Sequence, residues 1–397
     1  MAITKILNIQ ESEGRNPASH LKNALEYIQN PDKTEECILV GGINCLPDTA
    51  FEQMEETKNI FHKTGKRQGY HVIISFSPEE KVTAEQAMYV LEHFAKDVLG
   101  DDYEVLFIQG GASMQFDMVA MNFATPEKRG NYVLSGSFAS KACKEAEILG
   151  RGYVAASSKD TNFKHIPTQE EIKLSDDAAY LHVCYNNTIY GTEYHYIPET
   201  GNVPLIADMS SDILSRPLDF SKFSLIYAGV QKNLGPAGVA LVVARRSMLE
   251  KSPENLPTML RYDTYYKKNS LYNTPPAFGI YMVGKTAKWI KAQGGLEVMA
   301  ERNKKKAALV YDAIDNSNGF YAGHADKDSR SFMNVTFRLP NEELEKKFVA
   351  EALEQQLGGV KGHRSVGGMR ASIYNAMPYE GCEKLADFMD KFRKANA

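Results

Sequence analysis

Three apolar runs lie close together in the middle of this 397-residue chain, and each has the length and composition of a buried strand. They span residues 203–207, 224–230 and 239–244. The first run ends at Asp208, and the second is followed closely by Lys232, which opens a turn rich in Gly and Pro. Because open α/β sheets gather polar groups at the carboxyl ends of their strands, this pattern predicts that both residues share one crevice.

A carboxylate and a lysine amine in one crevice suit pyridoxal 5′-phosphate. That cofactor needs a lysine for its Schiff base and a carboxylate that keeps its pyridinium nitrogen protonated. A lone lysine after a strand is most often a surface residue, so the pairing with Asp208 and the Gly/Pro turn carries the inference. The sequence therefore predicts Lys232 as the catalytic residue and Asp208 as a cofactor ligand.

Composition is ordinary for a soluble globular protein, which we expect to be cytoplasmic, with 43% hydrophobic and 24% charged residues. The sequence contains no run of eighteen apolar residues and no charged-then-apolar leader, so we expect neither a membrane partner nor export. Its five cysteines are scattered, and no two stand at CxxC spacing. This spacing favours reduced thiols over a disulfide framework, and no metal site is expected.

Charge differs between the two ends of the chain. Residues 1–103 hold 10 Lys and Arg against 17 Asp and Glu, whereas the remaining residues hold 36 against 33. An acidic first segment is poorly suited to the phosphate backbone of a nucleic acid, so no nucleic-acid partner is expected.

Organisation along the chain predicts three parts. Residues 1–102 form an α+β segment, with strands expected at 2–10 and 70–76 and helices at 17–29, 51–63 and 83–98. Residues 103–295 alternate strands and helices, which predicts a large domain with a mostly parallel sheet. Residues 296–397 form a small α/β domain, with strands expected at 332–338 and 368–374 and helices at 341–356 and 380–394. A long helix over 286–314, interrupted near Gly294, joins the last two parts.

A glycine-rich turn follows the strand expected at 103–108. Gly110, Gly111, Ala112 and Ser113 precede a helix expected at 114–121, and such a turn offers backbone N–H groups and a helix N-terminus to a phosphate. Two glycines alone are weak evidence, but the whole stretch 109–116 is more specific. It resembles the cofactor-phosphate loop of the phosphoserine aminotransferases, which belong to the aspartate-aminotransferase-like superfamily (fold type I of pyridoxal-phosphate enzymes).

The resemblance continues from about residue 103 to the end of the chain. It rests on further motifs of the same family in the same order, at 182–191, 207–216, 227–236, 271–276 and 362–377. It implies an α/β fold with a large and a small domain, and transamination between O-phospho-L-serine and 2-oxoglutarate. The products would be 3-phosphohydroxypyruvate and L-glutamate, in L-serine biosynthesis.

The same resemblance assigns roles to individual residues. Lys232 would carry the cofactor, Asp208 would meet the ring nitrogen and Thr188 the ring hydroxyl. Ala112, Ser113 and Gln231 would hold the cofactor phosphate, helped by Asn273 and Thr274 from a second subunit, which implies a homodimer with shared active sites. Phe138 matches the aromatic residue that stacks on the cofactor ring, and the sequence fits a core aromatic equally well.

Substrate recognition falls to three residues near the C-terminus. Arginine suits carboxylates and phosphates because its planar guanidinium can donate two parallel hydrogen bonds. In the family pattern Arg370 would grip the α-carboxylate, while His363 and Arg364 would lie near the substrate phosphate.

Residues 1–102 depart from the family. Its members begin with a Ser-Gly-Pro-Ala-type segment and continue with a Ser-His-Arg segment that reaches the substrate phosphate across the dimer, and neither is present. The stretches 21–34, 65–76 and 99–103 instead resemble the start of a plasmid-mobilisation relaxase, truncated here, in which Tyr27 would be a candidate nucleophile for DNA. A relaxase also needs a metal held by clustered histidines, and the sequence has no His-x-His. A gene rearrangement and a misassembled sequence would both produce such a junction.

Three functions are therefore open. The first is phosphoserine transamination, with activity reduced by the replaced N-terminus. The second is a pyridoxal-phosphate-binding fusion protein that is catalytically impaired. The third and remote one is a DNA relaxase.

Overall fold

A computed structural model describes residues 3–10, 67–75 and 102–397 of the chain. The chain divides into two compact units, Met1–Val82 and Thr83–Ala397. In the first unit, β1 (Ile3–Gln10) pairs with β2 (Arg67–Ser75) in antiparallel register. Both strands occur where the sequence predicts them, although β2 begins three residues earlier. The three helices predicted before residue 102, and Tyr27, lie outside the described residues. The domain bounds 102/103 and 295/296 stay a prediction.

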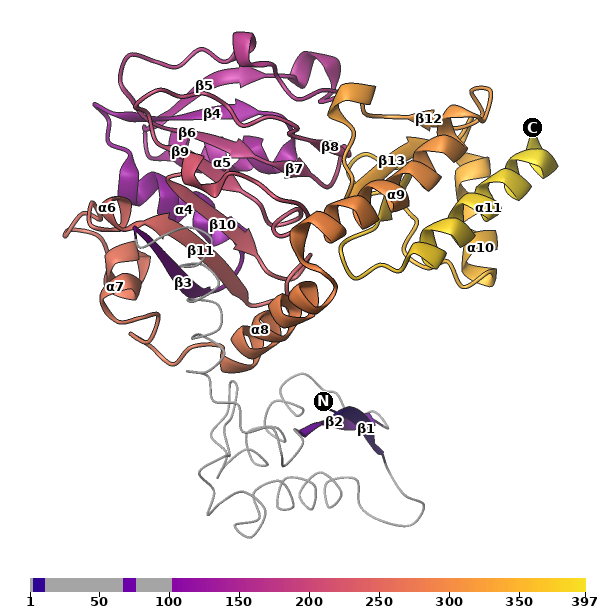
Figure 1. Cartoon of the computed structure of the whole chain (residues 1–397), viewed down its shortest axis with the longest axis horizontal. Helices are drawn as coiled ribbons and strands as arrows, with labels where there is room; N and C mark the ends of the chain where they lie inside the picture. The colour runs from indigo at the N-terminus through magenta and orange to yellow at the C-terminus, as the bar shows by residue number, and fades with distance from the viewer. Residues whose placement is uncertain (1–2, 11–66, 76–101) are drawn as a thin grey trace. The chain divides into compact units, whose positions relative to one another are not determined.

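The second unit is built on a seven-stranded sheet with the order β3-β11-β10-β9-β6-β4-β5 (Figure 1). Neighbouring strands run parallel except at β11, which is antiparallel to both β10 and β3. The reversal follows from the short turn between β10 and β11, since a parallel neighbour requires a longer crossover. The strands are β3 (Tyr103–Gln109), β4 (Arg129–Leu134), β5 (Gly152–Ser157), β6 (Ala178–Cys184), β9 (Leu205–Asp208), β10 (Leu225–Gly229) and β11 (Val239–Arg245).

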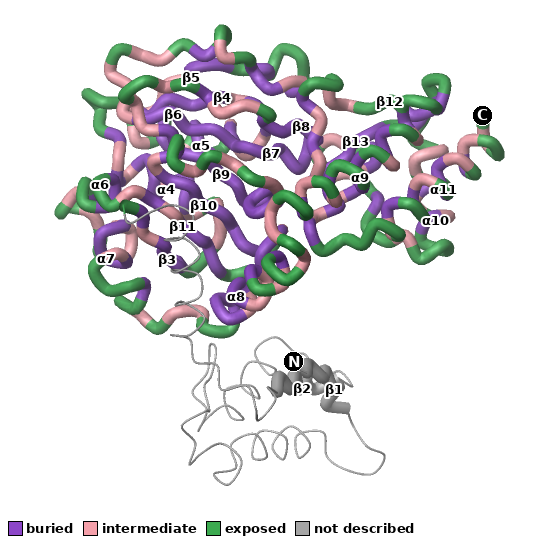
Figure 2. Tube along the Cα trace, viewed as in Figure 1, coloured by how far each residue is buried: buried purple, intermediate pink, exposed green. Residues whose placement is uncertain are grey.

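Alternate residues of these strands face two separate apolar layers. Phe107, Val183 and Ala207 belong to one layer, together with Ile280 and Val283 of α8 (Ala277–Ala292). Their neighbours on the strands, such as Ile108 and Ile206, belong to the other layer. That layer includes residues of α4 (Ala112–Phe123), α5 (Ser137–Ile148), α6 (Arg246–Leu249) and α7 (Tyr262–Lys267). A sheet covered on both faces explains the uninterrupted apolar runs in the sequence, and its strands are buried in Figure 2.

A three-stranded sheet with the order β12-β13-β14 forms a second, smaller core. Its antiparallel strands are β12 (Ala322–Gly323), β13 (Asn334–Arg338) and β14 (Met369–Ser372). Residues of α9 (Gly295–Asp315), α10 (Glu342–Glu354) and α11 (Tyr379–Asn396) pack against it. Short strands β7 (Asn186–Asn187) and β8 (Thr192–Glu193) pair as a small separate ladder in the loop region after β6. The α/β class with a mostly parallel sheet is thus as predicted.

Helix boundaries differ from the prediction in instructive ways. The interruption predicted near Gly294 separates α8 from α9, and Gly294 and Gly295 both have positive φ there. However, α8 begins at Ala277 instead of 286, because its glycine-containing start is held by burial of Ile280 against the sheet. Asn341, predicted as the first helical residue of α10, is instead its N-cap, and its side chain accepts a hydrogen bond from the Leu344 N–H. Helix α5 and strand β5 are absent from the prediction.

Candidate active site

The carboxyl ends of the central strands bring the predicted cofactor residues together. Asp208 is the last residue of β9, and Lys232 follows β10 by three residues. These strands are parallel neighbours, with Tyr227 opposite Asp208. Strand β3 runs in the same direction as β10, so the glycine turn that leads into α4 reaches the same edge. Asp208, Lys232 and the glycine turn therefore lie at one edge of the sheet, as the strand pattern predicts.

Asp208 is 5% exposed and held by its own chain. Its Oδ1 accepts hydrogen bonds from the Ser210 backbone N–H at 2.9 Å and from the Ser210 hydroxyl at 2.5 Å. Burial raises the pKa of this carboxyl, while the Lys232 ammonium and the Ser210 donors oppose the rise. Its Oδ2 accepts no hydrogen bond from the described residues, so it is available to a protonated ring nitrogen.

Lys232 lies against the ring of Phe138. The Lys232 Nζ is 4.8 Å from the centre of that ring. Phe138 is the second residue of α5, which begins where β4 reaches the same edge of the sheet. The sequence left open whether Phe138 is a core aromatic or a site residue. The structure places it beside the predicted catalytic lysine, where an aromatic face can cover a planar ring.

An anion cradle lies between α4 and the turn after β10. The N-cap of α4 is Gly111, which supplies no side-chain cap, so the first N–H groups of the helix are open to a ligand. A Cβ placed on Gly229 would come within 2.9 Å of the Gln231 Oε1 and 3.2 Å of the Ala112 N. Because Gly229 has no side chain, the Gln231 side chain and the Ala112 N–H can both lie close to it. Ser113 follows Ala112 in α4. The predicted phosphate ligands Ala112 and Gln231 therefore converge, and the residues present fit pyridoxal phosphate.

Arg370 spans the large and small cores. It stands on β14, and its Nη1 donates a hydrogen bond to the backbone oxygen of Thr188 at 3.1 Å. Its Nε is buried and finds no partner among the described residues. A buried N–H without an acceptor is costly, and a carboxylate would satisfy it. Thr188 itself is buried after β6, near the edge that holds Asp208.

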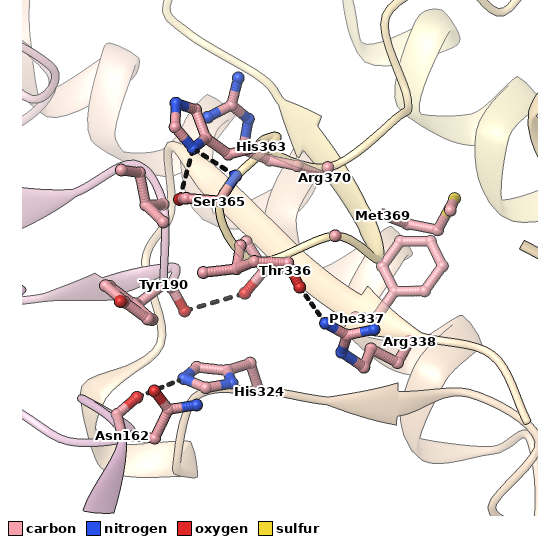
Figure 3. A pocket seen from close by; sticks show the side chains of 14 residues that line it. Asn162, Tyr190, His324, Thr336, Phe337, Arg338, His363, Ser365, Met369 and Arg370 are labelled. Atoms are coloured by element: carbon pink, nitrogen blue, oxygen red, sulfur yellow. Dashed lines mark hydrogen bonds between the residues drawn. The ribbon is translucent and has the colours of Figure 1, made fainter. Parts of the chain in front are cut away.

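A cavity of about 240 Å³ opens beside Arg370 (Figure 3). It is lined by both cores: from the large one come Asn162, Ile189 and Tyr190, and from the small one His324, Thr336, Phe337, Arg338, Gly362, His363, Ser365, Val366, Gly367, Met369 and Arg370. His363 and Arg370 are therefore brought together. Arg364 is not: it lines an adjoining cavity of about 500 Å³ with Lys346 and Lys361.

His363 has a defined hydrogen-bonding role. Its Nδ1 lies 2.7 Å from the Ser365 hydroxyl and accepts the Ser365 backbone N–H at 3.3 Å. Because Nδ1 accepts an N–H, the neutral ring carries its proton on Nε2, which can then donate to a ligand. The pKa of His363 is lowered, first by partial burial and then by the positive charges of Arg370, Arg364 and Lys141.

Asn273 and Thr274 lie in the loop before α8. The Thr274 backbone oxygen accepts a hydrogen bond from the Gln109 side chain of the same chain at 2.9 Å. Large apolar side chains stand around them, with Leu271 47%, Tyr272 48% and Phe278 42% exposed. The predicted contact of residues 273–274 with a second subunit stays a prediction.

Comparison with known proteins agrees with this geometry. The family model described as aminotransferase class-V matches residues 68–385. The phosphoserine aminotransferase of Lysinibacillus sphaericus is 57% identical over 356 residues, covering 89% of this chain and 96% of that protein. A solved phosphoserine aminotransferase from Bacillus circulans subsp. alkalophilus superposes with a TM-score of 0.78 at 52% identity, covering 87% of this chain and 96% of that one.

This chain belongs to the phosphoserine aminotransferase family. A PLP-bound phosphoserine aminotransferase from Trichomonas vaginalis is also similar, with a TM-score of 0.73, 36% identity, and coverage of 78% of this chain and 90% of that one. The family resemblance and the fold class predicted from the sequence are thereby confirmed, and so is the cofactor.

Two residues that contact predicted site residues of this phosphoserine aminotransferase are not themselves predicted from the sequence. Ser210 holds Asp208, and its hydroxyl also accepts a hydrogen bond from the Gly229 N–H at 3.0 Å, which joins the carboxylate to the phosphate cradle. Lys141 lies on α5, and its Nζ is 5.4 Å from the centre of the Phe138 ring. Helical spacing places Lys141 beside Phe138, but this signal requires α5, which is absent from the prediction.

A chain of buried amides connects the site to the smaller core. The Asn375 N–H, just after β14, donates to the Oδ1 of Asn233, the residue that follows Lys232, at 3.0 Å. The Asn375 side chain donates to the Leu214 backbone oxygen at 2.8 Å, and the Asn303 amide on α9 donates to the Asn375 Oδ1 at 2.8 Å. The strand that carries Arg370 is therefore tied to the turn that carries Lys232.

Metal-binding clusters and membrane spans are both absent from the described residues. Among residues 3–10, 67–75 and 102–397, no group of three or more His, Cys, Asp or Glu side chains could hold a metal ion. In the same ranges, no helix has the length and hydropathy needed to cross a membrane.

Proposed function

We propose that this chain exchanges the amino group of O-phospho-L-serine with 2-oxoglutarate, giving 3-phosphohydroxypyruvate and L-glutamate, in L-serine biosynthesis. The observation that carries this proposal is the convergence of Lys232, Asp208 and the Ala112–Gln231 cradle at one edge of the sheet. The family and its relatives support this function, and they give no support to the impaired fusion protein or to the DNA relaxase.

Pyridoxal phosphate, when bound, supplies an electron-withdrawing ring that stabilises negative charge at the substrate Cα. The chain's own residues place and protect that chemistry. Lys232 would hold the cofactor, and its amine, when free, would accept the proton from the substrate Cα. The Asp208 carboxylate would accept the hydrogen bond of the ring N–H. The first N–H groups of α4, with Ser113 and Gln231, would hold the cofactor phosphate, and Thr188 would form a hydrogen bond with the ring hydroxyl.

Residues on the substrate side of the site would bind and orient the substrate. Arg370 directs its unpaired Nε toward the α-carboxylate, while its Nη1 stays fixed on Thr188. His363 offers Nε2 to the substrate phosphate, and Arg364 adds a positive charge nearby. Because phosphate and carboxylate sit at opposite ends of phosphoserine, this arrangement fixes which bond at Cα faces Lys232.

The proposed enzyme acts as a homodimer in the cytoplasm. Leu271, Tyr272 and Phe278 form an exposed apolar surface beside Asn273 and Thr274, and burial of this surface against a second copy would bring those two residues to the partner's cofactor phosphate. Sedimentation of the purified chain should therefore give twice the mass of one chain. A monomer with full activity would contradict the shared site.

We also infer that residues 1–102 are a truncated relaxase-like segment without DNA chemistry. Their negative charge and the absence of His-x-His from the sequence support this inference. Incubation with single-stranded DNA and a divalent metal should leave Tyr27 unmodified. A covalent DNA adduct on Tyr27 would contradict it.

The decisive test of the proposed function is turnover of phosphoserine with 2-oxoglutarate by the purified chain and by Lys232→Ala. The wild-type chain should form glutamate and bind the cofactor covalently, whereas the variant should do neither. A folded wild-type chain that takes up no cofactor would overturn the proposal.

A further inference from the structure

We propose that Lys141 is a specificity-determining residue that holds the phosphate group of the substrate from the large-domain side of the cavity. This inference rests on the proposed function and deepens it. It concerns a residue for which the family motifs in the sequence give no role.

The position of Lys141 is set by its helix. It lies one turn after Phe138 on α5, so both side chains leave the same face. The Phe138 ring has the Lys232 Nζ 4.8 Å from its centre and the Lys141 Nζ 5.4 Å from it. One aromatic ring is thus shared by the catalytic amine and a second ammonium group.

The Phe138 ring beside Lys141 packs into a cluster that includes a residue of the smaller core. Phe138 packs against Phe163, Ile189 and Tyr190, and Val366 of the loop between β13 and β14 packs on the same cluster. That loop carries His363, whose pKa is lowered partly by the charge of Lys141. Ile189 and Tyr190 of this cluster line the same cavity as His363, so Lys141 lies near that cavity.

No carboxylate is paired with Lys141 in the described part of the chain, so its charge is open to a ligand. A phosphate dianion placed between Lys141 and His363 would meet donors from both cores. This chain lacks the Ser-His-Arg segment that supplies cations to the phosphate in its relatives. Lys141 would provide such a cation from within the large domain.

The test compares the holoenzymes of the wild type, Lys141→Met, Lys141→Arg and the matched control Lys144→Met. Lys144 lies on the same helix and is exposed, so it changes the net charge equally. In Lys141→Met we expect KM for phosphoserine to rise about tenfold with kcat nearly unchanged, the size of one lost charge-assisted hydrogen bond. Lys141→Arg should restore most of the affinity, and Lys144→Met should leave KM within roughly twofold.

Two further readouts distinguish phosphate binding from a structural role. The dissociation constant of inorganic phosphate, measured by calorimetry on the holoenzyme, should rise in Lys141→Met by a similar factor of about ten. KM for glutamate, which carries a carboxylate where phosphoserine carries a phosphate dianion, should rise less. In addition, loss of this cation should move the titration of His363 to higher pH, with Arg364 and Arg370 still facing it.

Unchanged phosphate affinity in Lys141→Met, or equal losses in Lys141→Met and Lys144→Met, would overturn the role of Lys141. Failure of the proposed function has a different signature: the wild-type chain would not transaminate phosphoserine at all. Phosphate affinity still tests Lys141 in that case, because it requires no turnover.

Discussion

The two halves of this active site hold their charged groups in different ways. Asp208, on the cofactor half, ends a buried strand of the large sheet and accepts two hydrogen bonds from Ser210. His363, on the substrate half, lies in a loop, and among the described residues its ring is hydrogen-bonded only by its near neighbour Ser365. The sheet therefore fixes the positions of the cofactor-binding residues. The positions of the substrate-binding residues depend instead on a loop and on the distance between the two cores.

The comparison predicts that changes on the cofactor half act mainly on kcat, and changes on the substrate half act mainly on KM. A group that stabilises charge during the reaction affects the transition state, while a group that grips the substrate throughout affects binding.

The largest effect is expected for Asp208→Asn. The amide can keep the Ser210 hydrogen bonds but brings no negative charge to the ring nitrogen, so kcat should fall about 10²- to 10³-fold. Steady-state kinetics with phosphoserine would measure it, with the exposed Asp160→Asn as control. A loss below tenfold would show that the carboxylate charge is dispensable.

A smaller effect is expected from the replaced N-terminus. Without the Ser-His-Arg segment, affinity for phosphoserine should be weaker by roughly ten- to a hundred-fold than in a version given back a family-type N-terminus. Discrimination against substrates without a phosphate should also be lower. Equal KM values for phosphoserine in the two proteins would show that the family segment is dispensable.

The Arg370→Lys variant tests whether Arg370 binds the substrate α-carboxylate. Lysine keeps the charge but cannot bond Thr188 and a carboxylate with one planar group, so KM for phosphoserine and for glutamate should both rise about tenfold. The shared effect distinguishes Arg370 from Lys141, whose loss should affect phosphoserine more. An effect on phosphoserine alone would assign Arg370 to the phosphate instead.

The smallest effect is expected for Gly229→Ala. The added methyl would crowd the Gln231 amide and the Ala112 N–H, and should lower affinity for pyridoxal phosphate about five- to tenfold. Cofactor titration followed by absorbance would measure it. Gly358→Ala is a matched control because nothing lies within 4 Å of its Cβ position. Similar losses in both variants would contradict the proposed cradle.

The cofactor half can be predicted from the sequence because its signals are local. Each strand end is marked by an apolar run and a polar residue beside it, and parallel strands bring those ends together. This pattern is sufficient to assign Asp208, Lys232 and Ala112 to one edge of the sheet.

The substrate half is harder to predict because its geometry depends on contacts distant in sequence. His363 and Arg364 are adjacent in the chain, yet they line different cavities. Lys141 is not predicted from the sequence because a residue on a helix becomes part of the site only when the smaller core packs near that helix. The start of α8 is not predicted from the sequence for a similar reason. Burial against the sheet outweighs the low helix propensity of its glycines.

The buried amide chain through Asn375 affects the thermal unfolding of the protein. Its hydrogen bonds are buried, so separating the two cores would leave several polar groups without partners. That cost opposes independent opening of the smaller core and couples the two cores into one cooperative transition. Heating should thus release the cofactor and unfold the C-terminal helices together, and a calorimetric scan of residues 103–397 should show one peak instead of two.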